Sequence, residues 1–143
     1  MNVRAFLDTN IIIYFYSETE IQKRDIAYKL LDNNDCITST QMFNEASNVW
    51  LKKYMLSVDT IKKYLNNVES VCDEVLLLNR KTIDFALDLK EWYGYSYYDC
   101  LMLASALESD CDIILTEDMS DGQIIESKLK IVNPFKNQKR EET

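Results

Sequence analysis

The chain has 143 residues, of which 47% are hydrophobic, and a formal net charge of −8. This length is typical of one domain, and the apolar fraction is ordinary for a protein with a substantial core. Two Gly and one Pro leave no composition for a flexible linker. The negative charge argues against wholesale electrostatic binding of nucleic acid and favours a cation-binding pocket or a basic partner.

Histidine is absent, and the four cysteines show no C-x-x-C spacing: Cys36, Cys72, Cys100 and Cys111. The first observation excludes Ser–His and Cys–His nucleophile schemes, and the second argues against a structural zinc site. We expect reduced, buried thiols in a cytoplasmic protein. No membrane span is expected, since no apolar run reaches about 18 residues. No signal peptide is expected either, because Arg4 and Asp8 interrupt the N-terminal apolar stretch.

The apolar pattern predicts strands that alternate with helices. In chain order we expect a strand at 3–7, a short helix after residue 8, a helix at 21–31, a strand at 36–39, helices at 41–55 and 58–71, a strand at 74–78, helices at 82–92 and 96–107, and strands at 113–115 and 131–132. Such alternation is typical of parallel βαβ units with helices on both faces. We therefore expect one domain over residues 1–135, an α/β fold in a three-layer α/β/α sandwich with a mostly parallel central sheet. Residues 136–143 are expected to form a basic, polar tail.

Asp8 interrupts the apolar sequence VRAFLDTNIIIYFY, which runs from Val3 to Tyr16. A charge in a core-forming run costs stability unless something compensates for it. Because Asp8 follows an expected strand, it either caps the next helix or belongs to a ligand site at the carboxyl edge of the sheet. The acidic sequence LTEDMSDG, from Leu115 to Gly122, follows another expected strand and reaches the same edge.

Two further acids lie on expected helices, beside apolar faces. Glu45 borders an apolar stripe, which fits either a half-exposed surface residue or a site residue. Asp99 precedes apolar residues at i+3, i+4 and i+7, which predicts a position in the centre of the buried face. Ser96 and Asp99 also match a capping box, but a capping box does not explain an acid on the apolar stripe. We therefore interpret Asp99 as a functional acid.

These acids are expected to converge at one end of the sheet. At about 5 Å and an effective dielectric constant near 20, each pair of carboxylates repels by about 3 kcal/mol. A divalent cation makes such a cluster tolerable, and oxygen-only ligands suit Mg²⁺ or Mn²⁺ rather than Zn²⁺.

The chain resembles the PIN domain family, and within it most of all the VapC-type toxins of bacterial toxin–antitoxin pairs. The sequences that carry the resemblance are FLDTN at Phe6–Asn10, the lone helix acid Glu45, YYDCLMLASAL around Asp99, and ILTEDMSDGQIIE followed by IVNPF. The resemblance implies that the catalytic and metal-binding acids are Asp8, Glu45, Asp99 and Asp118, accompanied by Thr9, Asn10 and Thr116. The T-x-D pattern selects Asp118 as the fourth acid, and Glu117 and Asp121 remain alternatives.

The implied activity is Mg²⁺- or Mn²⁺-dependent hydrolysis of RNA by an endoribonuclease. Thr116 is expected to hold Asp8 or a substrate phosphate by hydrogen bonding. Glu45 is expected to orient the attacking water. The number of bound metals, one or two, is left open. Lys52 and Lys53 are the expected phosphate contacts. The implied partners are a second copy in a homodimer and a cognate antitoxin that covers the active site. In addition, an exposed Tyr95 or Tyr97 is expected to stack on an unpaired base.

Two other functions fit part of the pattern. A receiver-like or phosphatase-like domain also binds Mg²⁺ among acids at strand ends and uses an aspartate as phosphoryl acceptor. However, LDTN lacks the second aspartate of a D-x-D motif, and no strand-end lysine is evident. An inactive PIN fold that only binds a partner is disfavoured by the acids at all four positions.

Overall fold

The computed structural model describes residues 2–136, which form six helices and six strands. In chain order these are β1 (Val3–Leu7), α1 (Thr9–Tyr14), α2 (Ile21–Asn33), β2 (Asn34–Ser39), α3 (Thr40–Lys52), α4 (Val58–Val71), β3 (Glu74–Leu76), α5 (Arg80–Tyr93), α6 (Tyr97–Glu108), β4 (Ile113–Leu115), β5 (Ile124–Ile125) and β6 (Leu129–Val132).

The strands form one sheet in the order β3-β2-β1-β4-β6-β5, with parallel pairing everywhere except between β5 and β6. β1 lies at the centre, where Phe6 is level with Ile37 of β2 and with Ile114 of β4. After β1 the chain adds β2 and β3 on one side and then returns to place β4 on the other. Ligand sites of open parallel sheets lie outside the carboxyl ends of the strands at such a reversal, which here falls at the end of β1.

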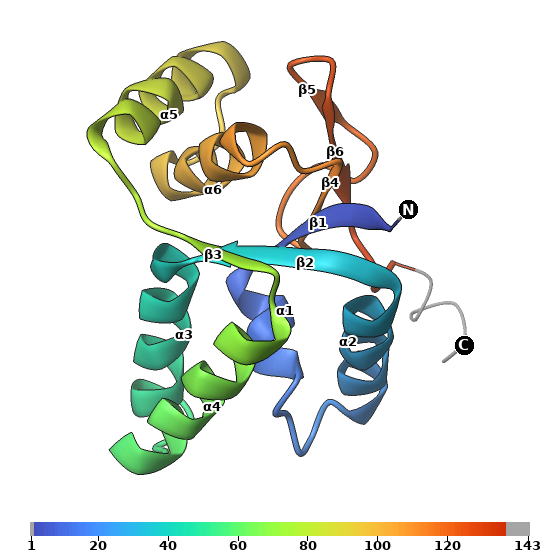
Figure 1. Ribbon diagram of the computed structural model, residues 1–143, viewed down its shortest axis with the longest axis vertical. Helices are drawn as coiled ribbons and strands as arrows, with labels where there is room; N and C mark the ends of the chain where they lie inside the picture. The colour runs from blue at the N-terminus through green and yellow to red at the C-terminus, as the bar shows by residue number, and fades with distance from the viewer. Residues whose placement is uncertain (1, 137–143) are drawn as a thin grey trace.

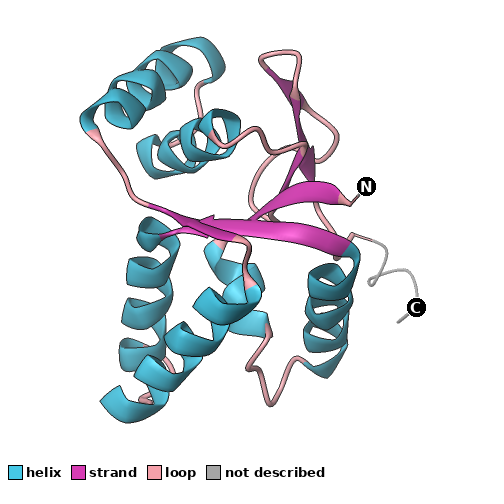
Figure 2. Ribbon diagram, viewed as in Figure 1, coloured by secondary structure: helices cyan, strands magenta, loops and turns pink. Residues whose placement is uncertain are grey.

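Helices cover both faces of the sheet, as Figures 1 and 2 show. α5 and α6 lie on one face, and α1, α2, α3 and α4 lie on the other (Figure 1). The expected three-layer α/β/α sandwich with a mostly parallel sheet is therefore confirmed. Ala5, Phe6 and Leu7 of β1 are fully buried because both faces of this strand are covered.

α6 is buried on nearly all sides, since it packs against α5 and contacts β2 and β4. Every residue from Cys100 to Leu107 is buried. Small side chains, among them Ala104 and Ala106, let the neighbouring elements approach closely. The helix therefore has no solvent-exposed face in this region.

Some boundaries differ from those expected from sequence. β5 was not predicted, because two residues are too few for a periodic signal, and its antiparallel pairing with β6 is the exception to the parallel sheet. α3 ends at Lys52 rather than at Met55, which takes a left-handed backbone conformation with φ of 55°. The proposed tail lies outside the described residues, apart from Lys136.

The four cysteines are free: three are buried, and Cys72 is half-buried. None of the helices that the structure describes is both long and apolar enough to cross a membrane.

Candidate active site

Asp8 lies at the carboxyl end of β1 and begins α1. Its backbone N–H donates to the carbonyl of Leu115 at 3.2 Å, which ties the end of β1 to the end of β4. Its carbonyl accepts from Ile11 and Ile12 in the first turn of α1. Asp8 is thus the N-cap of α1 in a position where only 7% of its surface is exposed.

Two short hydrogen bonds fix the carboxylate of Asp8. One oxygen accepts from the backbone N–H of Thr9 at 2.6 Å, and the other accepts from the hydroxyl of Thr116 at 2.6 Å. Burial nevertheless raises the pKa of Asp8 to about 6, because these two bonds lower it less than desolvation raises it. The negative charges of Asp118 and Asp99 raise the pKa further. The ionised form is therefore under strain at neutral pH.

The other acids lie close enough to interact, although they come from different layers. The charge of Asp99, on α6, raises the pKa of Asp8, Glu45 and Asp118 alike, after burial as the main cause in each. Glu45, on α3, is half-buried and accepts from the hydroxyl of Thr9 at 3.3 Å. Asp99 thus acts on each of the other three acids. We call Asp8, Glu45, Asp99 and Asp118 the acid cluster.

Asp99 does not lie in the centre of a buried face, as the sequence pattern had indicated, but is half-buried in the first turn of α6. The difference arises because α6 becomes enclosed only from Cys100 onward. Ser96 accepts from the backbone N–H of Asp99 at 3.2 Å, so one half of the capping box is present. Within residues 2–136 no group donates to the Asp99 carboxylate, which leaves its oxygens available to a ligand.

Glu117 and Asp121, the two alternatives for the fourth acid, are engaged with other side chains. Glu117 forms an ion pair with Lys23 at 3.2 Å and accepts from the hydroxyl of Tyr14. Asp121 forms an ion pair with Lys136 at 3.1 Å and accepts from a backbone N–H. Nothing in the sequence indicated the pairing of Lys23 with Glu117, because these residues are 94 positions apart.

Asp118 is held differently. Its backbone N–H donates to the Thr116 hydroxyl at 3.2 Å, and that hydroxyl donates to Asp8. Among the described residues its carboxylate accepts only from the Asn10 amide, at 3.3 Å. Thr116 therefore connects the two strand-end acids, and this geometry favours Asp118 over its neighbours as a member of the site.

A family model described as PIN domain matches residues 5–120. The chain belongs to the PIN domain family. Similar solved structures include a toxin–antitoxin complex from Klebsiella pneumoniae, with a TM-score of 0.68 and 21% identity over 91% of this chain and 97% of that one. VapC20 of Mycobacterium tuberculosis, a sarcin–ricin loop cleaving toxin, has a TM-score of 0.68 and 14% identity over 87% of this chain and 98% of that one.

A third similar structure is VapBC2 of Rickettsia felis bound to a promoter DNA fragment, with a TM-score of 0.62 and 16% identity over 92% of this chain and 100% of that one. At these identities the likeness shows a shared PIN fold. No curated protein matches the sequence significantly.

The acid cluster of this PIN domain offers only oxygen donors, which Mg²⁺ and Mn²⁺ prefer. In the part of the chain that the structure describes, no three acids or cysteines are grouped tightly enough to form a ready metal cage. Mg²⁺ usually keeps several waters and binds through one or two carboxylates. The acid cluster, with its oxygen-only donors, is consistent with that mode of binding.

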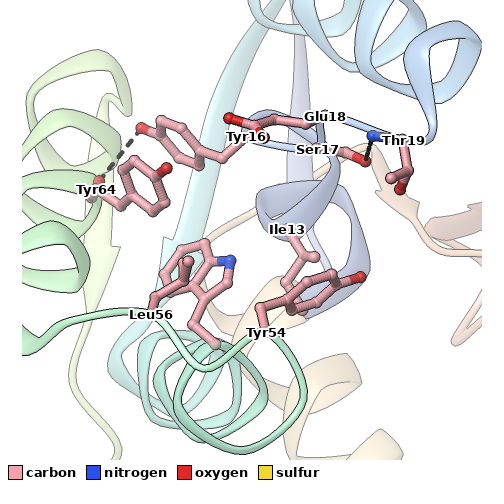
Figure 3. A pocket seen from close by; sticks show the side chains of 9 residues that line it. Ile13, Tyr16, Ser17, Glu18, Thr19, Tyr54, Leu56 and Tyr64 are labelled. Carbon is pink, nitrogen blue, oxygen red and sulfur yellow. Dashed lines mark hydrogen bonds between the residues drawn. The ribbon is translucent and has the colours of Figure 1, made fainter.

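The hollows near the helices include a groove and an aromatic-rich pocket. A groove of about 470 Å³ adjoins the acid cluster and includes Glu45 in its lining. A smaller pocket of about 220 Å³ has four aromatic residues among the nine that line it (Figure 3). In this pocket the rings of Tyr16 and Tyr64 stack at 3.8 Å between centroids, and Trp50 packs edge-on against both. Glu18 is its only acid among the described residues, so the acid cluster is the better candidate for an active site.

The raised pKa of Asp8 predicts a particular dependence of stability on pH. Between about pH 4 and pH 6 the folded state keeps a proton on Asp8 that the unfolded chain has released. The free energy of unfolding should therefore fall as the pH rises through this window, by about 3 kcal/mol from Asp8 alone. Asp8→Asn should remove most of this fall in urea titrations performed with EDTA at several pH values.

The matched control is Asp32→Asn, which changes an exposed acid on α2 and should leave the fall intact. Glu45 and Asp118 also have raised pKa values, so a smaller fall should remain in Asp8→Asn. An unchanged pH profile in Asp8→Asn would contradict the assignment of a strained carboxylate to this position.

Proposed function

We propose that this PIN domain is an Mg²⁺- or Mn²⁺-dependent endoribonuclease and the toxin of a toxin–antitoxin pair in the cytoplasm. The observation that carries the proposal is the buried carboxylate of Asp8, which faces two further acids across the carboxyl edge of the sheet. Burying a carboxylate beside other acids costs stability, and capping α1 does not require that burial. A cation site for phosphodiester hydrolysis gives the arrangement a function.

The proposed roles follow from the contacts of each acid. Asp8 and Asp99 would hold the cation, and Asp118 and Glu45 would complete the site directly or through water. A bound divalent cation would supply a water of lowered pKa and neutralise charge on the phosphate. Thr116 holds Asp8 in one orientation through its 2.6 Å hydrogen bond. Glu45 has a pKa raised by burial and by Asp99, which suits it to accept a proton from the attacking water.

In this proposal the end of α3 offers contacts to both RNA and a protein partner. Lys52 and Lys53 are exposed at the end of α3 and are the proposed phosphate contacts. The turn between α3 and α4 exposes large apolar side chains next to the aromatic pocket, with Met55 at 81% and Val58 at 57% exposure. Exposed apolar patches of this kind mark protein interfaces. We propose that an antitoxin that covers the active site also contacts this patch, and that the protein is a homodimer.

The similar structures support the toxin assignment. One is a toxin–antitoxin complex, one is VapBC2 bound to promoter DNA, and one is a sarcin–ricin loop cleaving toxin. The charge of −8 is consistent with a basic protein partner.

The proposal predicts that RNA cleavage needs Mg²⁺ or Mn²⁺ and is lost in Asp99→Asn. The substitution keeps the shape of the side chain and removes repulsion within the acid cluster. The metal-free variant should therefore be as stable as wild type or more stable, by up to about 1 kcal/mol at this half-exposed position. Mn²⁺ should raise the melting temperature of wild type more than that of the variant.

The measurements are RNA cleavage assays and melting curves, each with EDTA and with Mn²⁺, and Asp32→Asn serves as the control for loss of one acidic charge. Cleavage that persists in excess EDTA would overturn the metal requirement. A destabilised but fully active Asp99→Asn protein would show that this residue acts only in the structure of the helix end.

The toxin assignment predicts growth arrest in a bacterial host. Induction of wild-type protein should stop growth, whereas induction of Asp8→Asn to the same soluble level should not. Coexpression with the product of a small neighbouring gene should restore growth. Normal growth under strong induction of soluble wild-type protein would count against the toxin assignment and would leave the nuclease assignment to the cleavage assay.

A further inference from the structure

The groove beside the acid cluster has a lining unlike that of a phosphate site. It is formed by α3, the end of the segment that follows β3, and the start of α6, through Thr40, Gln41, Asn44, Glu45, Asn48, Leu78, Tyr98 and Leu101. Its volume of about 470 Å³ lies in the range of small-ligand sites. Because Glu45 belongs both to the groove and to the acid cluster, a molecule in the groove would lie next to the reacting phosphate.

Three carboxamides follow one face of α3 in this groove. Gln41, Asn44 and Asn48 have the i, i+3 and i+7 spacing that places side chains in one row. Asn44 and Asn48 are exposed, and neither side-chain amide bonds to another described residue. In a helix interior Asn has low helix propensity, so two unpartnered asparagines in one row are not explained by the fold.

Gln41 is only 7% exposed, and its contacts fix its orientation. Its amide nitrogen donates to the carbonyl of Tyr98 at 3.2 Å and reaches a carboxylate oxygen of Glu45 at 3.5 Å. A flipped amide would point its oxygen at these two acceptors. The amide oxygen therefore faces away from them, and it is a buried acceptor without a partner among the described residues. A buried polar group of this kind costs stability unless a ligand or water completes it.

The charge of the lining limits what can bind. The described lining residues include one acid, Glu45, and no lysine or arginine, so a phosphate would be repelled. A nucleobase is neutral, and its edge carries the donors and acceptors that Asn and Gln amides match in pairs. Tyr98, which is 63% exposed, offers a ring on which an unpaired base can stack. Lys52 lies one helical turn beyond Asn48, where it can contact the RNA phosphate next to the bound base.

We propose that this groove is a specificity subsite for one unpaired nucleobase of the RNA, adjacent to the phosphate that the acid cluster cleaves. The proposal rests on the nuclease function proposed above. It assigns base discrimination to Asn44 and Asn48, with Tyr98 as the stacking surface, in place of Tyr95, whose hydroxyl is bonded to Gln123 and Ser120.

The first arm of the test measures kcat/KM on short single-stranded RNAs that carry each base, or an abasic residue, at each position flanking the cut. For wild type, kcat/KM should fall about tenfold when the base at one position is removed. The double variant Asn44→Ala, Asn48→Ala should cleave the normal and the abasic RNA at nearly equal rates. Asn66→Ala, an exposed asparagine on α4, should keep the wild-type ratio.

The second arm needs no catalysis. The side-chain amide signals of Asn44 and Asn48 are followed by NMR while each of the four ribonucleosides, which carry no phosphate, is added. At least one nucleoside should shift both signals in a saturable way. If wild type cleaves no RNA but the signals shift, the nuclease function fails and the base subsite stands.

A different combination of results would overturn the subsite and leave the nuclease function standing. In that case wild type cleaves RNA, the double variant loses as much kcat/KM on abasic RNA as wild type does, and no nucleoside shifts the signals. Signals that respond to a protein partner but to no nucleoside would also overturn the subsite, since the groove would then be part of a protein interface.

Discussion

The buried carboxylate of Asp8 is the constraint on which the rest of the site depends. Its backbone joins the ends of β1 and β4, and its side chain receives hydrogen bonds from Thr9 and Thr116. These contacts hold the group in one place and leave its charge poorly compensated, with a pKa raised to about 6. A solvent-exposed aspartate would cap α1 with a smaller loss of folding stability. The burial of Asp8 therefore indicates a function.

The acid cluster can form because the sheet lies between its contributors. Glu45 comes from α3 on one face and Asp99 from α6 on the other, while Asp8 and Asp118 follow the central strands β1 and β4 (Figure 1). All four therefore meet at the carboxyl edge, where the strand order reverses. The same placement brings the amide row of α3 against the start of α6, so a cleavage site and a base-reading groove can share Glu45.

Much of this was predictable from the sequence, and the failures have physical reasons. The alternation of apolar runs indicated the three-layer fold, and Asp8 was conspicuous because a charge interrupts an apolar run. The burial of Asp99 was overestimated, since the pattern gives the face of a helix but not the residue at which neighbours enclose it. The engagement of Glu117 by Lys23 depends on tertiary contacts and left no local signal. The sequence did indicate the position of Gln41, because a spacing of four residues on a helix places it beside Glu45.

The central claim is that a divalent cation relieves the strain on the Asp8 carboxylate. Isothermal titration calorimetry of Mn²⁺ binding, repeated in buffers of different ionisation enthalpy, measures how many protons each bound metal releases. With the pKa of Asp8 at about 6, binding at pH 5.5 should release a substantial fraction of a proton, and binding at pH 7.5 should release almost none. Asp8→Asn should lose this difference. Absence of Mn²⁺ binding by wild type, or binding with the same proton release at both pH values, would contradict the account.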